Sequence, residues 1–219
     1  MTTAPDGRPE PPPRPVIAGV LLAGGQSRRM GGGDKCLKSL AGRPILSHVL
    51  ARVASQVDAL LLNANGDPNR FADFGLPVAG DSVEGFAGPL AGVLTGLEWA
   101  EREVPDCRWV ASFACDAPFV PVNLVTRLWA EVEEAGADMA CASSRGRDHP
   151  VFGLWPLDRK DDLRRALEEG VRKVDQWTGR YRLVKIDFPD LTTSWGPLDP
   201  FFNTNRPEDL EEAARCLLP

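Results

Sequence analysis

Short runs of consecutive apolar residues alternate along this chain with segments of helical periodicity, and this alternation limits the fold more than any other feature. Val16–Leu22 and residues 59–62 and 109–115 have the character of buried strands, whereas residues 45–57 carry apolar side chains at helical spacing. Strands that are apolar throughout are typical of a parallel sheet covered on both faces. The sequence therefore predicts an α/β fold with a mostly parallel, doubly wound sheet and helices on both faces.

The rest of the chain continues this alternation within one domain. Further strands are expected at residues 76–79 and 182–188, and at 139–142 and 151–155 around a polar turn; further helices are expected at residues 89–101, 122–135, 163–169, 171–177 and 207–217. With 219 residues, one large domain is a better expectation than two small ones. Residues 1–15 contain six prolines and no large apolar residue after Met1, which predicts a disordered tail before a single domain at residues 16–219.

Charge and cysteine content argue against several classes of protein. The formal net charge is −6, from 31 acidic and 25 basic residues, and no long block of Lys or Arg points to polymeric nucleic acid as a partner. No apolar run approaches the roughly 18 residues that span a bilayer, and the amino end lacks the apolar stretch of a secretory signal, so we expect a cytoplasmic protein with no membrane partner. Five cysteines without a CxxC pair predict reduced, mostly buried thiols.

The first predicted strand leads into a loop of unusual composition. Residues 23–35 hold five glycines, the adjacent Arg28 and Arg29, and a closing Asp-Lys pair that ends at Lys35. Neither GxxxxGK[ST] nor GxGxxG occurs in the chain. Glycines let backbone N–H groups approach an anion, and three clustered cations repel one another unless an anion or solvent separates them. The loop suits a nucleoside triphosphate; the alternative is a plain turn with solvated arginines.

Carboxylates and amides follow the predicted strands. An unpaired carboxylate at Asp116, directly after an apolar strand, would be costly if buried. A Mg²⁺ ion shared with phosphates would remove that cost, and so would a role in capping the turn at Ala117; the residues alone do not decide between the two. Asp81 could accept both N–H donors on one edge of guanine, or simply begin a loop, and Asn63 could be a turn residue.

The glycine-rich loop belongs to a longer pattern. Residues 22–37, LAGGQSRRMGGGDKCL, resemble the LAGGxxxRMGxDKxL signature of the molybdenum cofactor guanylyltransferase family, within the GT-A-like nucleotidyltransferases. Further matches occur in the family's order and at similar spacing: Asn63 and Asn65, Asp81, residues 88–92, Asp116, residues 148–150, Asn203 and Asn205. The resemblance covers nearly all of the chain beyond residue 15 and implies a Rossmann-like nucleotidyltransferase fold.

The resemblance also implies a reaction. A terminal phosphate of molybdenum-molybdopterin attacks the α-phosphorus of GTP, which gives the guanine dinucleotide form of the cofactor and pyrophosphate. Mg²⁺ is the implied cofactor, and molybdoenzymes or their chaperones are the implied recipients of the product. Because two anions meet in this reaction, cations and a divalent metal should matter more than acid–base groups.

Roles can be carried over residue by residue. The resemblance implies that Lys35, Asp116 and Arg28 are catalytic, with Asp116 as the metal ligand and Lys35 on phosphate oxygens. The implied binding positions for nucleotide or acceptor are Leu22, Ala23, Gly24, Gly25, Lys35, Asn63, Asp81, Gly88, Asp116, His149, Asn203 and Asn205. His149 belongs to the acceptor side only by resemblance, since it could equally be a turn residue bonded to Asp148. Likewise, Asn205 could be a helix cap.

Three alternatives remain open. The first is a cytidylyltransferase that acts on the same cofactor, and the second is a sugar-phosphate nucleotidyltransferase of the same fold. The third belongs to another class: a nucleotide-binding regulatory module without turnover. The presence of both Lys35 and Asp116 argues against the module, and the Ala23-Gly24-Gly25 sequence favours guanine by resemblance only.

Overall fold

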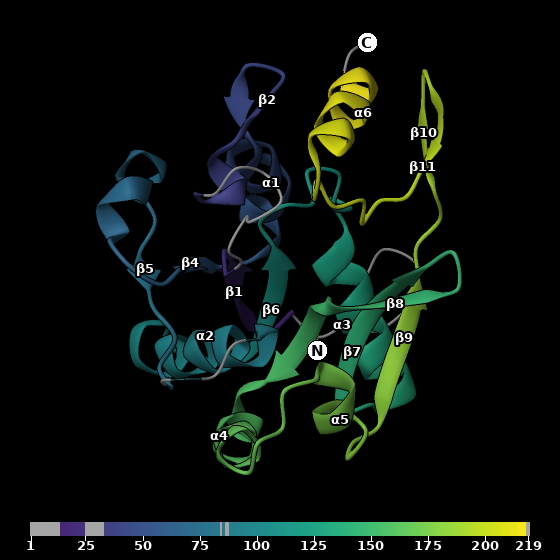
Figure 1. Cartoon of the computed structure of the whole chain (residues 1–219). Helices are drawn as coiled ribbons and strands as arrows, with labels where there is room; N and C mark the ends of the chain where they lie inside the picture. The colour runs from purple at the N-terminus through teal and green to yellow at the C-terminus, as the bar shows by residue number, and fades with distance from the viewer. Residues whose placement is uncertain (1–13, 25–32, 84, 86–87, 218–219) are drawn as a thin grey trace, which may run out of the picture.

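β1 (Val16–Leu22) lies inside a seven-stranded sheet in the structure, a computed structural model that describes residues 14–24, 33–83, 85 and 88–217 (Figure 1). In order along the sheet, the strands are β5 (Val78–Ala79), β4 (Ala59–Asn63), β1, β6 (Cys107–Ala114), β8 (Arg147–Pro156), β7 (Met139–Ser144) and β9 (Leu183–Asp187). Neighbouring strands are parallel, except that β8 runs against both β6 and β7. The predicted mostly parallel sheet is confirmed.

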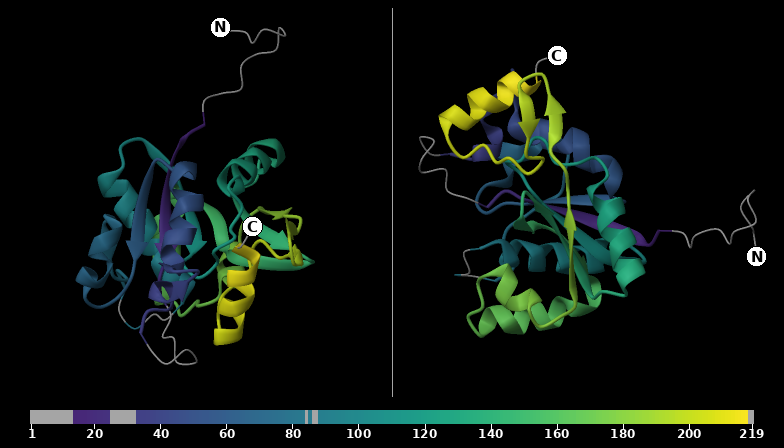
Figure 2. Two further views of the ribbon diagram at one scale, coloured as in Figure 1. Left: turned by 90° about the horizontal axis from the view of Figure 1, so that it is seen from above. Right: turned by 90° about the vertical axis from the view of Figure 1, so that its right-hand side faces the viewer.

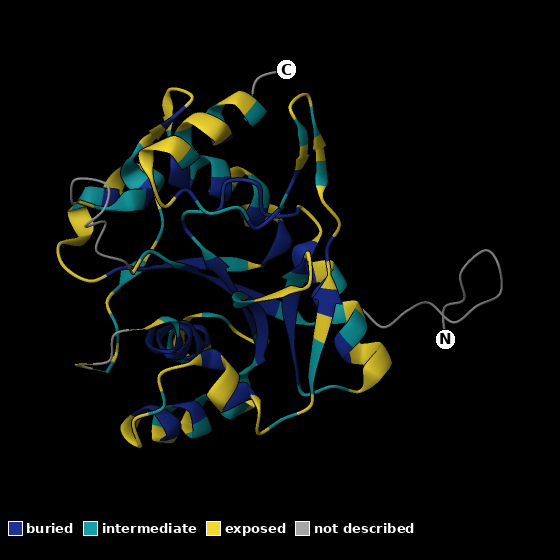
Figure 3. Ribbon diagram, turned by 45° about the vertical axis from the view of Figure 1, so that its right-hand side comes forward, coloured by how far each residue is buried: buried dark blue, intermediate teal, exposed yellow. Residues whose placement is uncertain are grey.

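Helices cover both faces of this sheet, as Figures 2 and 3 show. One face carries α1 (Ile45–Val53), α3 (Leu124–Ala135) and α6 (Pro207–Leu217), and the other carries α2 (Pro89–Glu103), α4 (Lys160–Glu168) and α5 (Val174–Thr178). In β1, Ile17 and Leu21 pack into the first layer while Ala18 and Val20 pack into the second, and all four are fully buried. This burial on both faces explains why the strand is apolar throughout.

The connections contain short elements that the sequence does not predict. They are the hairpin of β2 (Ser39–Leu40) and β3 (Arg43–Pro44), the hairpin of β10 (Leu191–Thr193) and β11 (Gly196–Leu198), and the 3-10 helices η2 (Lys35–Leu37), η3 (Ala54–Gln56), η4 (Pro68–Phe74) and η5 (Leu157–Arg159). Strands of two or three residues are too short to show alternation, and most of these 3-10 helices are too short to show a helical period.

The polar turn expected between β7 and β8 is shorter than predicted. β8 begins at Arg147 rather than at residue 151, and the turn consists of Arg145 and Gly146, whose φ angles are 51° and 72°. Positive φ at both central residues is the backbone of a tight hairpin whose twist matches that of the strands. As a result, His149 lies in a strand and not in a turn, which corrects the turn alternative for this residue.

The helix predicted at residues 171–177 is also shorter, because its first residues terminate α4. Gly170 adopts a left-handed conformation with φ of 93°, and the N–H of Val171 donates to the carbonyl of Ala166 at 2.9 Å. Such a glycine followed by a backward hydrogen bond is a common way to end a helix. Only α5 is therefore left of the predicted segment.

The predicted tail meets the domain at its last residues. Arg14 Nη2 lies 2.9 Å from Asp58 Oδ1, and the N–H of Ile17 donates to Asp58 Oδ2 at 2.7 Å. These contacts fix the entry into β1. Residues 1–13 lie outside the described residues, so the disordered tail stays a prediction.

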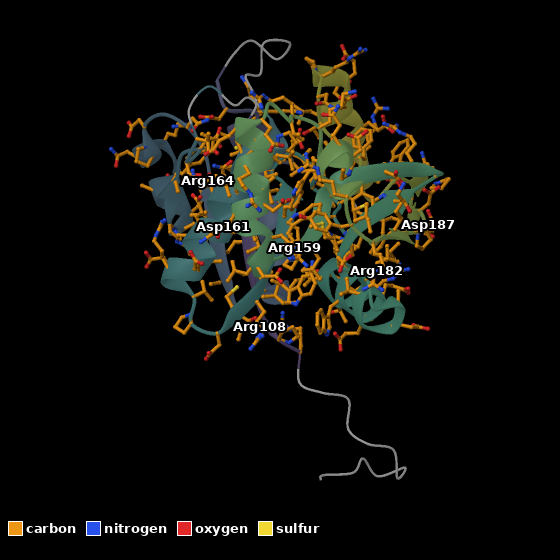
Figure 4. All side chains as sticks on the ribbon, turned by 90° about the horizontal axis from the view of Figure 1, so that it is seen from below. Arg108, Arg159, Asp161, Arg164, Arg182 and Asp187 are labelled. Carbon is orange, nitrogen blue, oxygen red and sulfur yellow. The ribbon has the colours of Figure 1, made fainter. Side chains whose placement is uncertain are left out.

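The end of the molecule away from α6 carries charged side chains of both signs (Figure 4). Arg164 pairs with Glu98 of α2, and Arg182 Nε lies 3.6 Å from Asp138 Oδ2. The Arg182–Asp138 pair is the more exposed of the two, and exposed pairs contribute little to stability. Among the described residues, no helix is both long and apolar enough to cross a membrane.

Candidate active site

The carboxyl ends of neighbouring strands bring most of the predicted residues to one edge of the sheet. β1 ends level with β4 on one side and β6 on the other, and β4 ends beside β5. Ligands of open α/β sheets bind beyond this edge. The predicted residues at or just beyond it are Leu22, Ala23, Asn63, Asp81 and Asp116.

Lys35, Asp116 and Asn205 form the centre of the site although they are far apart in the sequence. The Lys35 ammonium pairs with Asp116 Oδ2 and also donates to Asn205 Oδ1. The side chains of Lys35 and Asp116 are only 16% and 24% exposed, so neither is an ordinary solvated charge. In this structure each of the two side chains is engaged by the other.

The segment at residues 199–205, which precedes α6, holds Asn205 in place. Thr204 donates its N–H and its hydroxyl to the carbonyl of Asp116, at 3.0 and 3.2 Å. At the start of α6, Asp209 Oδ2 accepts the N–H groups of Asn205 and Arg206 at 2.7 and 2.8 Å. Asp209 therefore does the capping, and the Asn205 side chain is free to contact Lys35, which corrects the helix-cap alternative.

A second cluster lies on the β4 and β5 side of Lys35. Asn63, 4% exposed, donates to Asp81 Oδ1 at 3.0 Å and to the carbonyl of Ala79 at 3.2 Å. Asn65 donates to Asp81 Oδ2 at 2.8 Å and accepts the N–H of Asp81 at 2.8 Å. Two amides thus fix the plane of the Asp81 carboxylate, and each oxygen keeps a lone pair for a ligand. The turn-residue alternative does not describe Asn63, which ends a buried strand.

Gly92 of α2 makes room for this second cluster. A Cβ at Gly92 would lie 2.3 Å from Asn63 Oδ1 and 2.6 Å from Leu22 Cδ2, distances at which one of the groups must move. Gly88, just before the helix, has φ of 152°, a conformation that favours glycine. The GPLAG match thus has a physical basis in the close approach of α2 to the site.

We expect Gly92→Ala to weaken nucleotide binding beyond its effect on stability, because the added methyl group displaces Asn63. Overpacking of this kind costs about 1–3 kcal/mol of unfolding free energy. The matched control is Gly96→Ala, one turn further along α2, where the added Cβ would lie 2.8 Å from Val20 and touches no site residue. The assignment of the Asn63 cluster to nucleotide binding is supported if both variants lose similar stability and only Gly92→Ala has a raised KM for the nucleotide. Equal KM values in the two variants would contradict it.

A third cluster lies on the β7 and β8 side of Asp116. His149 Nε2 lies 2.7 Å from the Ser144 hydroxyl, which donates to Asp199 Oδ1 at 2.8 Å. Asp148, its neighbour in the chain, instead pairs with Lys185 at 2.6 Å. Burial lowers the pKa of His149, and the charge of Asp199 acts in the opposite direction. The sequence identified His149 but gave no sign of Ser144 or Asp199, because neither stands in a recognised spacing.

Arg70 of η4 is another residue that the sequence did not identify. Its guanidinium contacts Asp34, the neighbour of Lys35, with Nε 2.5 Å from Oδ2, and donates to the carbonyl of Asn65 at 2.5 Å. It therefore ties the end of the glycine-rich loop to the Asn65–Asp81 cluster. Asp34 stands in the loop signature, but a single Arg in a polar segment carries no signal of its own.

The buried thiols are poor nucleophiles, as the sequence indicated. Cys115, beside Asp116, is 3% exposed, and burial raises its pKa. Burial also raises the pKa of Cys141 to about 11. All five cysteines are free.

Several predicted residues flank the site or fall outside the described part of the chain. Ala23 extends the pairing of β1, since its N–H donates to the carbonyl of Asn63 at 2.9 Å, and Gly24 is exposed beyond it. The Oδ1 atom of Asn203 is buried and has no hydrogen-bond partner among the described residues. Gly25 and Arg28 lie outside the described residues, so their roles stay predictions.

Comparisons with known proteins find a matching family model, closely related sequences and a solved structure of the same fold. Residues 19–183 match the model of the MobA-like NTP transferase domain. A molybdenum cofactor guanylyltransferase of Rhodopseudomonas palustris (strain BisB5) is 52% identical over 93% of this chain and 95% of its own length. One from Mesorhizobium japonicum is also 52% identical, over 92% and 96%. The crystal structure of molybdopterin-guanine dinucleotide biosynthesis protein A from Archaeoglobus fulgidus superposes with a TM-score of 0.67 at 22% identity, over 90% of this chain and 96% of that one.

Proposed function

Because this chain belongs to the MobA-like NTP transferase family, we propose that it is a molybdenum cofactor guanylyltransferase, which transfers GMP from GTP to the terminal phosphate of molybdenum-molybdopterin and releases pyrophosphate. The chain is a nucleotidyltransferase, and its guanylyltransferase relatives match it over nearly their whole length. The resemblance found in the sequence is thereby confirmed at the level of the family. We place the enzyme in the cytoplasm and molybdoenzymes or their chaperones downstream of it.

The observation that carries the proposal is the Lys35–Asp116–Asn205 contact at the carboxyl edge of the sheet. It lies between a cluster suited to a base, at Asp81, and a cluster suited to a second substrate, at His149. A transferase that joins two phosphate-bearing molecules needs its charges at such a midpoint, because both anions and the developing transition-state charge meet there. A protein that only bound a nucleotide would have no need of the third cluster.

Lys35 is the residue that neutralises phosphate. Its ammonium is a compact point charge held by two acceptors, so little freedom is lost when phosphate oxygens replace or join them. The sequence predicts that the glycines that precede it supply backbone N–H groups for the same purpose. No covalent intermediate is required, which agrees with the buried, high-pKa thiol of Cys115.

Asp116 fits a Mg²⁺ ion that is shared with substrate. Among the described residues, no group of three or more His, Cys, Asp or Glu side chains could form a metal cage. A lone, partly exposed carboxylate beside the phosphate-binding lysine is the donor set expected for Mg²⁺, which takes one or two carboxylates together with phosphates and waters. When bound, the ion would neutralise phosphate charge and polarise the α-phosphorus. The Thr204 contacts to its backbone hold Asp116 at the place where its carboxylate would bind the ion.

Base recognition is assigned to Asp81, and acceptor recognition to Asn203 and His149. The Asp81 carboxylate is held in plane by Asn63 and Asn65 and can accept both N–H donors of guanine. The buried, unpartnered Oδ1 of Asn203 would be costly without a donor, and a bound substrate would supply one.

Nucleotide choice is the test of this proposal. If Asp81 accepts the guanine edge, CTP or ATP leaves that acceptor unpaired at a cost of about 1–3 kcal/mol, so GTP should bind at least roughly tenfold more tightly. A ligand that binds only the folded state raises the melting temperature in step with its affinity. We therefore expect GTP with Mg²⁺ to raise Tm more than CTP or ATP with Mg²⁺.

The outcomes separate the alternatives. Stabilisation by CTP and not by GTP would favour the cytidylyltransferase and overturn the role of Asp81. Asp81→Leu should abolish the preference among the three nucleotides, while the Mg²⁺-dependent gain in Tm remains. Release of pyrophosphate only when molybdopterin is present identifies the transferase; tight GTP binding without any release would identify the regulatory module.

A further inference from the structure

The order of strands fixes the side from which the second substrate approaches. Along the sheet edge, the base cluster follows β5 and β4, and Asp116 follows β6. β8 runs in the opposite direction: its last residues, 154–156, pair with β6, and its first residues, 147–149, pair with the carboxyl end of β7 at the same edge. The nucleotide occupies the β4 and β5 side, so the acceptor has to reach the α-phosphorus from the β8 side. His149 lies in the first part of β8, and the segment at residues 199–205 connects its surroundings to Lys35.

The hydrogen bonds around His149 have only one consistent direction. Asp199 Oδ1 accepts the N–H of Phe201 at 2.9 Å, so this oxygen acts as an acceptor in the cluster. The Ser144 hydroxyl, 2.8 Å away, therefore donates to it and has no second proton to give. The 2.7 Å contact between Ser144 and His149 Nε2 must then run from an Nε2–H to the serine oxygen.

Two phenylalanine rings pack against the His149 ring, and the burial of Ser144 excludes another role for the serine. The His149 ring lies against Phe201, with centroids 4.6 Å apart, and near Phe152 at 6.5 Å. Ser144 is fully buried, so it is no candidate nucleophile. Within the described part of the chain, Nδ1 of His149 has no protein partner, and it is not among the buried unpaired atoms.

We infer that Asp199 and Ser144 are positioning residues that lock neutral His149 as the Nε2–H tautomer, and that His149 offers its Nδ1 lone pair to an N–H donor on the ring system of the acceptor. The inference deepens the proposed function, on which the identity of the acceptor rests. A pterin carries ring and exocyclic N–H groups, which are the partners that an imidazole lone pair accepts. His149 thus recognises the acceptor through this hydrogen bond and takes no proton from the phosphate.

The tautomer can be observed directly in the full-length protein. The chain has two histidines, so long-range ¹H–¹⁵N spectra at about pH 8, above the ordinary histidine pKa, contain two rings. His48 serves as an internal reference, because its Nε2 lies 2.8 Å from the Leu40 carbonyl and must carry the proton. We expect His149 to show the same Nε2–H pattern. A proton on Nδ1 of His149 would overturn the inference.

Two substitutions of Asp199 test whether Asp199 and Ser144 fix the tautomer of His149. In Asp199→Asn, the N–H of Phe201 still donates to the side-chain oxygen and holds it toward Ser144. Ser144 can therefore still donate to this oxygen, and His149 should remain the Nε2–H tautomer. In Asp199→Ala, the Ser144 hydroxyl becomes free to donate to His149, and Nδ1–H should become populated. An unchanged tautomer in Asp199→Ala would refute the positioning role.

Kinetics with saturating GTP test the contact with the acceptor. His149→Asn places an amide oxygen close to the position of Nδ1. His149→Gln instead places its amide group close to the position of Nε2, which faces Ser144, and leaves no acceptor at the Nδ1 position. Loss of one neutral hydrogen bond should raise the KM for molybdopterin roughly three- to tenfold in His149→Gln and Asp199→Ala, and less in His149→Asn. His48→Gln is the matched control and should leave this KM unchanged.

The result separates the inference from the proposed function. The KM for GTP and the gain in Tm on addition of GTP should match those of the wild type in the His149 variants, because the contact belongs to the acceptor side. Equal molybdopterin KM values for His149→Gln and His149→Asn would overturn the Nδ1 contact. Absence of guanylyl transfer by the wild type would overturn the proposed function, and the tautomer measurement would still decide the lock.

Discussion

Lys35→Ala is expected to reduce kcat/KM for GTP by roughly two to three orders of magnitude, the usual effect of removing a preorganised group that stabilises transition-state charge. The Lys35 ammonium is the cation of the described residues that reaches both Asp116 and Asn205, so no other cation in that part of the chain is placed to replace it. The measurement is steady-state pyrophosphate release over a range of GTP concentrations.

The loss should reflect chemistry and not unfolding. The side chains of Lys35 and Asp116 are largely buried, so Lys35→Ala leaves the Asp116 carboxylate without its cation and should lower Tm as well. Turnover is therefore compared at a temperature well below the Tm of the variant. Lys38→Ala is a suitable control, since Lys38 follows η2 and makes no ion pair in the described part of the chain. Lys35→Arg keeps the charge but replaces a point charge by a planar fork, so we expect only partial activity. Wild-type turnover in Lys35→Ala would contradict the assignment of this loop to the catalytic site.

The regular elements of the fold could be predicted because they obey local patterns. β1 and α6 begin and end at the predicted residues. A continuous apolar run marks the strand, and apolar residues at helical spacing after Pro207 mark the helix. The direction of β8 could not be predicted, because a strand that is buried in the middle of a sheet is apolar whichever way it runs. That direction is what brings His149 to the same edge as Asp116.

The site itself was predicted as a set of positions but not as a set of contacts. Strand ends placed Asn63, Asp81 and Asp116 near one another through the general geometry of parallel sheets. The contact of Lys35 with Asn205 spans 170 residues, and the partner of Ser144, Asp199, lies in an irregular segment. Such contacts depend on how loops pack against one another, for which a sequence pattern gives no period or spacing.

The pairing of Lys35 with Asp116 also shows what substrate binding must change. In this structure the two charges neutralise one another, and Asn205 shares the ammonium. Under the proposed function, a triphosphate would bring additional negative charge, so that Lys35 would become the counter-ion of phosphate and Asp116 would be released to a cation. The two residues therefore act as one unit, and their substitutions should be strongly non-additive.

Asp116→Asn should lower kcat by roughly two to three orders of magnitude, with little recovery at high Mg²⁺, because the amide keeps the size of the side chain but loses the charge that attracts the ion. The measurement is kcat across a Mg²⁺ titration, with Asp187→Asn, an exposed position on β9 that is labelled in Figure 4, as the control. In Asp116→Asn, Lys35 keeps two neutral amide oxygens as acceptors but loses the carboxylate charge, so its ammonium is freer to bind phosphate. GTP should consequently still raise Tm in the variant although turnover is lost. Loss of GTP binding together with turnover would mean that Asp116 serves mainly to position Lys35, and full activity with an unchanged Mg²⁺ requirement would exclude Asp116 as the metal ligand.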